Sequence, residues 1–136
     1  MTSPFGLGRS NDDGETWNWH KFEAFDDSKF EFAYSRCIQT PWNDETIIVC
    51  VGDYIPGRIG AIEVSKDGGK SFTRADLGQT PKATMYWLAT HQNLPGVALA
   101  TSVYGQIYAT DDYCQSWNKL DRELGEVRAS LIVPAL

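Results

Sequence analysis

The chain has 136 residues, of which 42% are hydrophobic, 22% charged and 12% aromatic, a composition typical of a folded globular domain. Its net charge is −6 and it has no run of lysine or arginine, which argues against nucleic acid and against an anionic membrane as partners. No stretch approaches the roughly eighteen apolar residues that cross a bilayer, and residues 1–10 lack the apolar segment of a signal peptide, so we expect a cytoplasmic protein.

Short stretches of strand-forming residues alternate with turns rich in Gly, Pro, Asn and Asp, which predicts an all-β fold without helices. One predicted strand, residues 4–9, precedes residue 10, and a second strand leaves the turn that begins there. The other predicted strands, in chain order, cover residues 32–39, 46–51, 61–65, 71–74, 84–90, 97–102, 106–110, 115–120 and 127–133. Together with the two strands on either side of the first turn, these nine bring the predicted total to eleven.

Three segments of the chain repeat one short turn pattern of hydroxyl, any, Asp, any, Gly, any, hydroxyl and aromatic residues. The third segment departs from it at one place, where Cys114 stands in the glycine position. The residues in the pattern are Ser10, Asp12, Gly14, Thr16 and Trp17, then Ser65, Asp67, Gly69, Ser71 and Phe72, then Thr110, Asp112, Ser116 and Trp117.

Each position of this turn has a structural reason. The Asp and the first hydroxyl hydrogen-bond to backbone groups within the turn, and the glycine supplies a positive φ. The closing aromatic residue starts the next strand and packs into the core. We therefore expect a structural role for all three turns. A cysteine at a positive φ is strained by roughly 1–2 kcal/mol, so we expect the third turn to bend differently or to be degenerate.

The spacing of the turns gives the repeating unit. Ser10 and Ser65 are 55 residues apart, and Ser65 and Thr110 are 45 apart, which suits propeller blades of four strands and about 40–50 residues. We label the strands of a blade A to D from the inside of the propeller outward. Residues 1–22 are then predicted to form strands C and D of one blade, and residues 30–76 and 82–120 to form two full blades. Residues 125–136 are predicted to form strand A of the next blade. The sequence thus predicts an arc of a β-propeller built from antiparallel four-stranded blades.

The three turns resemble those of the BNR/Asp-box β-propellers, the superfamily that includes sialidases and related glycoside hydrolases. The stretch from Tyr104 to Ala129 is similar to the end of bacterial sialidase-like chains of that superfamily. The resemblance implies the C-terminal part of a propeller that carries six to eight blades when closed. We refer to the three turns as Asp boxes from here on.

An open arc leaves blade faces and strand edges exposed to water, and such surfaces favour association. Two explanations stay open: the chain is the C-terminal part of a longer propeller, or two copies close a six-bladed ring. The partner is therefore expected to be the upstream portion or a second copy of this chain.

The catalytic residues of sialidases are not matched here. Their chemistry requires three arginines, a Tyr–Glu pair and a further acidic residue, and Arg58-Ile59-Gly60 lacks the proline of the family's Arg-Ile-Pro signature. We therefore predict no catalytic residue, no metal and no cofactor. The main interpretation is a non-catalytic scaffold or binding module, with two alternatives: part of a glycoside hydrolase whose catalytic residues lie upstream, or a factor that binds another protein.

A ligand site is predicted on the inner strands and on the loops between strands B and C, where propeller ligands bind. Aromatic rings beside carboxylates and arginines suit carbohydrate, because sugar C–H faces stack on rings while hydroxyls need polar partners. The candidate residues are Asp53, Tyr54, Arg58, Tyr86, Trp87, Tyr104, Glu126 and Arg128. Cys37 and Cys50 flank one hairpin, and we expect two buried thiols there because adjacent-strand disulfides are strained.

Overall fold

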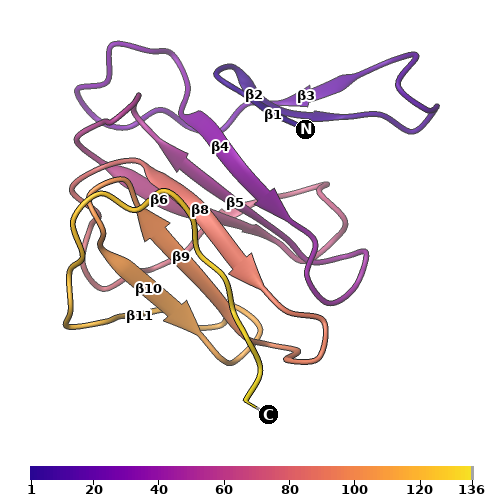
Figure 1. Cartoon of the computed structure of the whole chain (residues 1–136). Coiled ribbons are helices and arrows are strands. Elements are labelled where there is room, and N and C mark those ends of the chain that lie inside the picture. The colour runs from indigo at the N-terminus through magenta and orange to yellow at the C-terminus, as the bar shows by residue number, and fades with distance from the viewer. Residues whose placement is uncertain (136) are drawn as a thin grey trace.

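The computed structural model describes residues 1–135, which form three antiparallel β-sheets and no helix (Figure 1). Sheet 1 has three strands, β1 (Thr2–Ser3), β2 (Gly6–Arg9) and β3 (Asn18–His20). Sheet 2 has four: β4 (Tyr34–Gln39), β5 (Ile47–Gly52), β6 (Gly60–Ser65) and β7 (Thr73–Arg74). Sheet 3 also has four: β8 (Met85–Thr90), β9 (Ala98–Ser102), β10 (Ile107–Thr110) and β11 (Asn118–Lys119). In each sheet the strands lie in sequence order.

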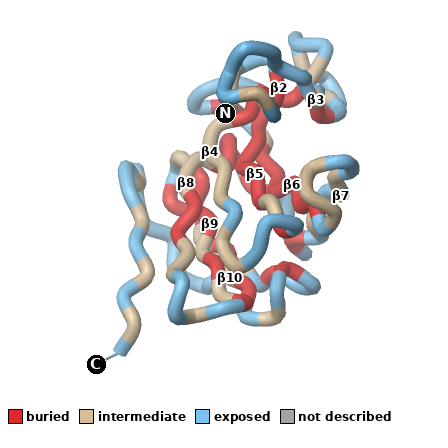
Figure 2. Tube along the Cα trace, turned by 90° about the vertical axis from the view of Figure 1, so that its right-hand side faces the viewer, coloured by how far each residue is buried: buried red, intermediate tan, exposed pale blue. Residues whose placement is uncertain are grey.

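Sheet 2 lies between the other two sheets and is buried on both faces. Successive residues of a strand point to opposite faces of a sheet. Accordingly, Ile48 and Ile62 contribute to one core cluster, whereas Val49 and Ala61 contribute to another. This explains why β5 and β6 are buried along nearly their whole length (Figure 2).

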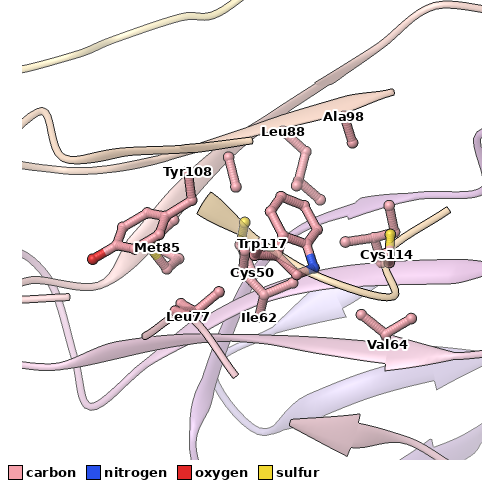
Figure 3. Close-up of a cluster of buried hydrophobic side chains, with 12 residues drawn as sticks. Cys50, Ile62, Val64, Leu77, Met85, Leu88, Ala98, Tyr108, Cys114 and Trp117 are labelled. Atoms are coloured by element: carbon pink, nitrogen blue, oxygen red, sulfur yellow. The ribbon is translucent and has the colours of Figure 1, made fainter. Parts of the chain in front are cut away.

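The larger core cluster fills the space between sheets 2 and 3. Figure 3 shows Trp117, which precedes β11, near Cys50 and Ile62 of sheet 2, with Tyr108 beside Met85 at one end of the cluster and Val64 towards the other. The Tyr108 hydroxyl, at the edge of this cluster, donates to the Gln79 carbonyl at 2.9 Å, so the buried phenol has a partner.

The second core cluster joins sheets 1 and 2. Leu7 and Phe22 pack there with Val49, Val51 and Ala61. The sheets are stacked in the same way at both interfaces: β8 lies against β4, β5 and β6, and β4 lies against β1 and β2. The first strand of each full sheet therefore packs across the sheet before it.

The all-β prediction is confirmed, and the eight strands predicted between residues 32 and 120 correspond to β4 to β11 within a few residues. The total of eleven also agrees, but its distribution is different. The predicted strand 4–9 is β2 alone, since residues 4 and 5 form the turn after β1, which was not expected. Sheet 1 thus has three strands where two were predicted.

The predicted strand 127–133 is wrong as a sheet strand. The described residues 121–135 contain no β-strand, although the backbone N–H of Val127 donates to the Val103 carbonyl at 3.3 Å. The physical reason is the lack of a neighbouring strand, because an extended segment joins a sheet only when a second strand offers a row of hydrogen bonds. Leu136, the last residue of the predicted segment, lies outside the described residues.

Candidate functional site

The three Asp boxes connect the last two strands of each sheet and have one hydrogen-bond pattern. In the second box, the Ser65 hydroxyl donates to Asp67 Oδ1 at 2.8 Å and accepts from the Gly69 N–H at 2.8 Å. The Ser71 hydroxyl donates to Asp67 Oδ2 at 2.6 Å, and its N–H donates to Oδ1 at 3.0 Å. The same four bonds recur around Asp12 and around Asp112. Each carboxylate is thus used within its own turn.

The expectation that the third box would bend differently is wrong. Cys114 has a φ of 63°, and its N–H donates to the Thr110 hydroxyl at 3.1 Å, as the glycine N–H does in the other boxes. Its neighbour Tyr113 also has a positive φ of 61°. The Asp112 bonds fix the turn tightly enough to impose this conformation on a residue with a Cβ.

The hydrogen bonds of the boxes predict a sensitivity to acid. The Ser116 hydroxyl, followed by its N–H, lowers the pKa of Asp112 to about 2 from 3.8, and equivalent bonds lower the pKa of Asp12 and Asp67. A carboxyl with a lowered folded-state pKa stabilises the fold above its unfolded pKa, and this stability is lost as the pH falls. We expect the melting temperature to drop between about pH 4 and pH 2.

The matched variant for this prediction is Asp112→Asn, which cannot titrate. It should melt at a lower temperature than the unsubstituted protein at neutral pH and show a shallower loss of melting temperature between about pH 4 and pH 2. Circular dichroism melts across this range measure both effects. An unchanged acid dependence in the variant would show that the box carboxylate does not contribute.

Asp53 is a structural residue of the β5–β6 loop. Its side chain is buried and accepts from the backbone N–H groups of Tyr54 at 3.1 Å, Arg58 at 2.9 Å and Ile59 at 3.4 Å. Arg58 Nε lies 3.4 Å from its second oxygen, while most of the Arg58 side chain is exposed. The loop is shaped by this one carboxylate, whose hydrogen bonds are made to its own loop.

Four of the predicted ligand residues come together at one hollow of about 460 Å³. Tyr86 and Trp87 line it from the start of β8, and Glu126 and Arg128 line it from the segment after sheet 3, with their side chains paired at 3.1 Å. We call this hollow the aromatic–acidic hollow; its remaining lining residues are Ile55, Val103 and Val127. It lies at the end of the sheets where β4 and β8 begin, opposite the Asp boxes (Figure 1).

The rings of the aromatic–acidic hollow are held in place by neighbours. Arg36 of β4 places its guanidinium 4.4 Å from the centre of the Tyr86 ring, a cation–π contact that sequence reasoning missed. Trp87 meets Tyr86 edge to face at 4.9 Å, and its Nε1 donates to the Val127 carbonyl at 3.0 Å. The two aromatic residues are therefore fixed before any ligand binds.

The other predicted residues lie elsewhere. Asp53 and Tyr54 line a second hollow of about 650 Å³, together with Phe5, Phe30 and other residues that sequence reasoning missed. Tyr104 is exposed and lines neither hollow. Ile55 borders both hollows, so they are adjacent. No sequence signal pointed to Phe5, because residues 4–9 were predicted as a single strand.

Glu63 is the buried carboxyl of the sheets. It lies 2.8 Å from Arg74 Nε, and burial raises its pKa although the Arg74 guanidinium opposes the shift. Arg74 in turn stacks on Phe25 at 4.5 Å and donates to the Glu23 carbonyl at 2.8 Å. These contacts close the interface between sheets 1 and 2, so Glu63 is a structural ion pair.

The cysteines are free thiols. Cys37 and Cys50 are directly opposite each other on β4 and β5, with Cys50 fully buried and Cys37 half-buried. Burial raises the pKa of the Cys50 thiol, and it raises that of Cys114 to about 12. Residues 1–135 contain no group of three or more His, Cys, Asp or Glu side chains arranged to hold a metal ion.

Comparisons with known proteins give no family for this chain. No family model matches the sequence, and no curated protein matches it. Within the described part of the chain there is also no helix of the length and apolar character that a membrane crossing requires. The resemblance to Asp-box propellers therefore depends on the three boxes and on the sheets that they connect.

Proposed function

We propose that the chain is an arc of a sialidase-like Asp-box propeller, in which sheets 1, 2 and 3 are successive blades. The support comes from the identical place of the box in each sheet and from the identical stacking at the two sheet interfaces. In such an arc β4 and β8 are the innermost strands, and the boxes lie at the periphery. The hollow beside the start of β8 then faces the centre.

We propose that the function of this arc is non-catalytic binding of carbohydrate at the aromatic–acidic hollow. The observation that supports it is the meeting of Tyr86 and Trp87 with the ionic pair Glu126–Arg128. Rings stack on the C–H face of a sugar, while a carboxylate and a guanidinium accept from and donate to its hydroxyls. A volume of about 460 Å³ accommodates a small saccharide.

The lining argues against hydrolysis. Glycosidases place two carboxyl groups roughly 5–10 Å apart across the scissile bond. Among the described residues that line this hollow, Glu126 is the only one with a carboxylate, and its partner is Arg128. The proposal therefore expects binding without turnover of aryl glycosides.

A glycan array followed by calorimetry tests the proposal. The protein should bind a defined set of glycans, and Arg128→Gln or Glu126→Gln should weaken binding about tenfold or more, since each removes a charged hydrogen-bonding group worth about 1.5–3 kcal/mol. Both side chains are mostly exposed, so neither variant should lose stability. Arg122→Gln, an exposed arginine outside the hollow, is the matched control.

Two results would contradict this proposal. Absence of binding to any glycan on the array would remove the carbohydrate ligand, and equal binding by Arg128→Gln and the control would move the site away from the hollow. Release of aryl alcohol from aryl glycosides by the pure protein would overturn its non-catalytic character.

A further inference from the structure

A hollow of apolar side chains lies directly beside the aromatic–acidic hollow. We call it the apolar hollow; its volume is about 650 Å³, and the apolar part of its lining includes Phe5, Phe30, Phe32, Tyr34, Tyr54 and Ile55. Phe30 is 54% exposed, Tyr54 40% and Ile55 41%. Single apolar side chains on a surface are ordinary, whereas a set of them gathered around a hollow is typical of a binding site.

The apolar hollow is formed by two segments that contact each other. One is the connection that leads from sheet 1 to β4, and the other is the β5–β6 loop. Arg58 Nη2, from the loop, donates to the Asp27 carbonyl of the connection at 3.3 Å. The Phe32 ring is held between the Lys21 ammonium, 4.5 Å from its centre, and the edge of Phe5, whose ring centre is 6.3 Å away. The hollow therefore exists in the free protein.

Apart from its tyrosine hydroxyls, the apolar hollow has little that could bind the hydroxyl groups of a sugar. The carboxylate of Asp53 accepts from three backbone N–H groups of its own loop. The other charged side chains of the described lining, Lys29 and Glu31, are exposed and stay hydrated. A polar group that leaves water without a hydrogen-bond partner weakens binding. This hollow therefore fits an alkyl or aryl group better than a second sugar.

The two hollows occupy equivalent places in the fold. Each lies between two neighbouring sheets and is lined by the start of the first strand of the later sheet, with Tyr34 of β4 in one and Tyr86 of β8 in the other. Ile55 lines both hollows, so one ligand can extend from one into the other. The charged pair Glu126–Arg128 belongs only to the aromatic–acidic hollow. A molecule that fills both is therefore polar at one end and apolar at the other.

We propose that the ligand of this protein is a glycoside with an apolar aglycone, whose sugar occupies the aromatic–acidic hollow and whose aglycone occupies the apolar hollow. This inference rests on the proposed function and adds the chemical class of the ligand. The aglycone contributes affinity by leaving water, at about fourfold for each methylene group that is fully buried. The sugar determines the orientation, because its hydroxyls meet charged groups on one side only.

Calorimetry with matched pairs of glycosides tests this inference. The probes are the methyl and hexyl β-glycosides of glucose, galactose and N-acetylglucosamine, so the two members of a pair differ only in the aglycone. The hexyl chain is short enough for the glycoside to stay monomeric in solution. For a sugar that binds, the hexyl member should bind about 10–100-fold more tightly than the methyl member, since the chain is only partly buried.

Variants of the apolar hollow locate this gain. Phe30→Ser and Tyr54→Ser each remove an exposed ring that lines the apolar hollow and not the other one. Each should reduce the hexyl gain by about fivefold or more and leave the affinity for the methyl glycoside unchanged. Tyr104→Ser is the matched control, because Tyr104 is exposed and lines neither hollow; it should keep the full gain.

Three results would overturn the inference. The first is equal binding of the methyl and hexyl members of every pair. The second is a hexyl gain that both Phe30→Ser and Tyr54→Ser retain, because the chain would then lie elsewhere. The third is a gain that Tyr104→Ser loses to the same extent as they do.

Binding of 1-hexanol, which has the chain and no sugar, separates this inference from the proposed function. If the hexyl glycosides bind no more tightly than 1-hexanol and the methyl glycosides do not bind, the sugar contributes nothing and the proposed carbohydrate site is wrong. If the methyl glycosides bind and the hexyl chain adds nothing, the carbohydrate site stands and only the apolar aglycone is excluded.

Discussion

Replacing Ile62 by alanine is expected to lower the free energy of unfolding by about 2–5 kcal/mol. Ile62 is fully buried and lies in the core cluster between sheets 2 and 3, among Cys50, Met85 and Tyr108. The substitution removes three methyl or methylene groups and leaves a cavity that close-packed neighbours fill only in part. Urea unfolding followed by tryptophan fluorescence measures the loss.

The same unfolding experiment also tests whether the opposite face of sheet 2 is covered. Val49 lies on the opposite face of sheet 2, towards sheet 1, and is also fully buried. Val49→Ala should therefore cost stability as a core substitution does, about 1–3 kcal/mol. Leu131→Ala, at a position 76% exposed, should change stability by less than about 0.5 kcal/mol. If either Ile62→Ala or Val49→Ala behaved like the exposed control, sheet 2 would not be covered on both faces.

Gly57→Ala is expected to be the most damaging single methyl addition in the loop beside the aromatic–acidic hollow. Gly57 has a φ of 77°, and a Cβ there would lie 2.6 Å from the Tyr54 carbonyl and 2.6 Å from Asp53 Oδ1. Both contacts are closer than real Cβ atoms approach. Asp53 cannot retreat without breaking its bonds to the loop, and the Tyr54 carbonyl is held by the Thr84 hydroxyl, which donates to it. We expect a loss of about 2–4 kcal/mol, from backbone strain and overpacking together.

Gly78→Ala is the matched control for this loss. Gly78 also has a positive φ, of 65°, but a Cβ there meets nothing within 4 Å. It should cost only the backbone strain, about 1–2 kcal/mol. The difference between the two variants in urea unfolding isolates the steric contact inside the β5–β6 loop, and equal losses would contradict the tight loop seen here.

Much of the fold could be predicted because its signals are local. A run of β-branched residues marks β5, and the Ser-x-Asp-x-Gly pattern marks the turn between β6 and β7. The backbone conformation of Cys114 could not be predicted, since the hydrogen bonds around Asp112 outweigh the strain of a cysteine at a positive φ. The backbone preference of cysteine is overridden there by a hydrogen-bond network that exists only in the folded turn.

The strand predictions at the two ends of the chain were wrong for a different reason. Residues 127–133 have the composition of a strand, and the burial pattern of Ser130 to Pro134 is that of an extended chain. Whether such a segment pairs depends on a neighbour that the sequence pattern cannot provide. β1 was missed because two residues, Thr2 and Ser3, are too few to give a periodic signal.

The candidate site was predicted in part. Tyr86, Trp87, Glu126 and Arg128 meet as expected, because the start of β8 and the segment after sheet 3 lie at the same end of the stack. The bonds of Asp53 to its own loop could not be predicted, since a carboxylate that binds three backbone N–H groups is indistinguishable in sequence from one that faces a ligand. Arg36 was missed because its contact with Tyr86 joins two different sheets.

The central claim is that the Asp boxes maintain the architecture while ligands bind at the opposite end of the sheets. Titration of the ¹⁵N-labelled protein with the glycan that binds most tightly on the array tests it most directly. We predict shifts at the Trp87 indole, at Glu126 and at Arg128, with the N–H signals of Ser71 and Ser116 unmoved. Shifts centred on the box residues, with the Trp87 indole unchanged, would contradict the account.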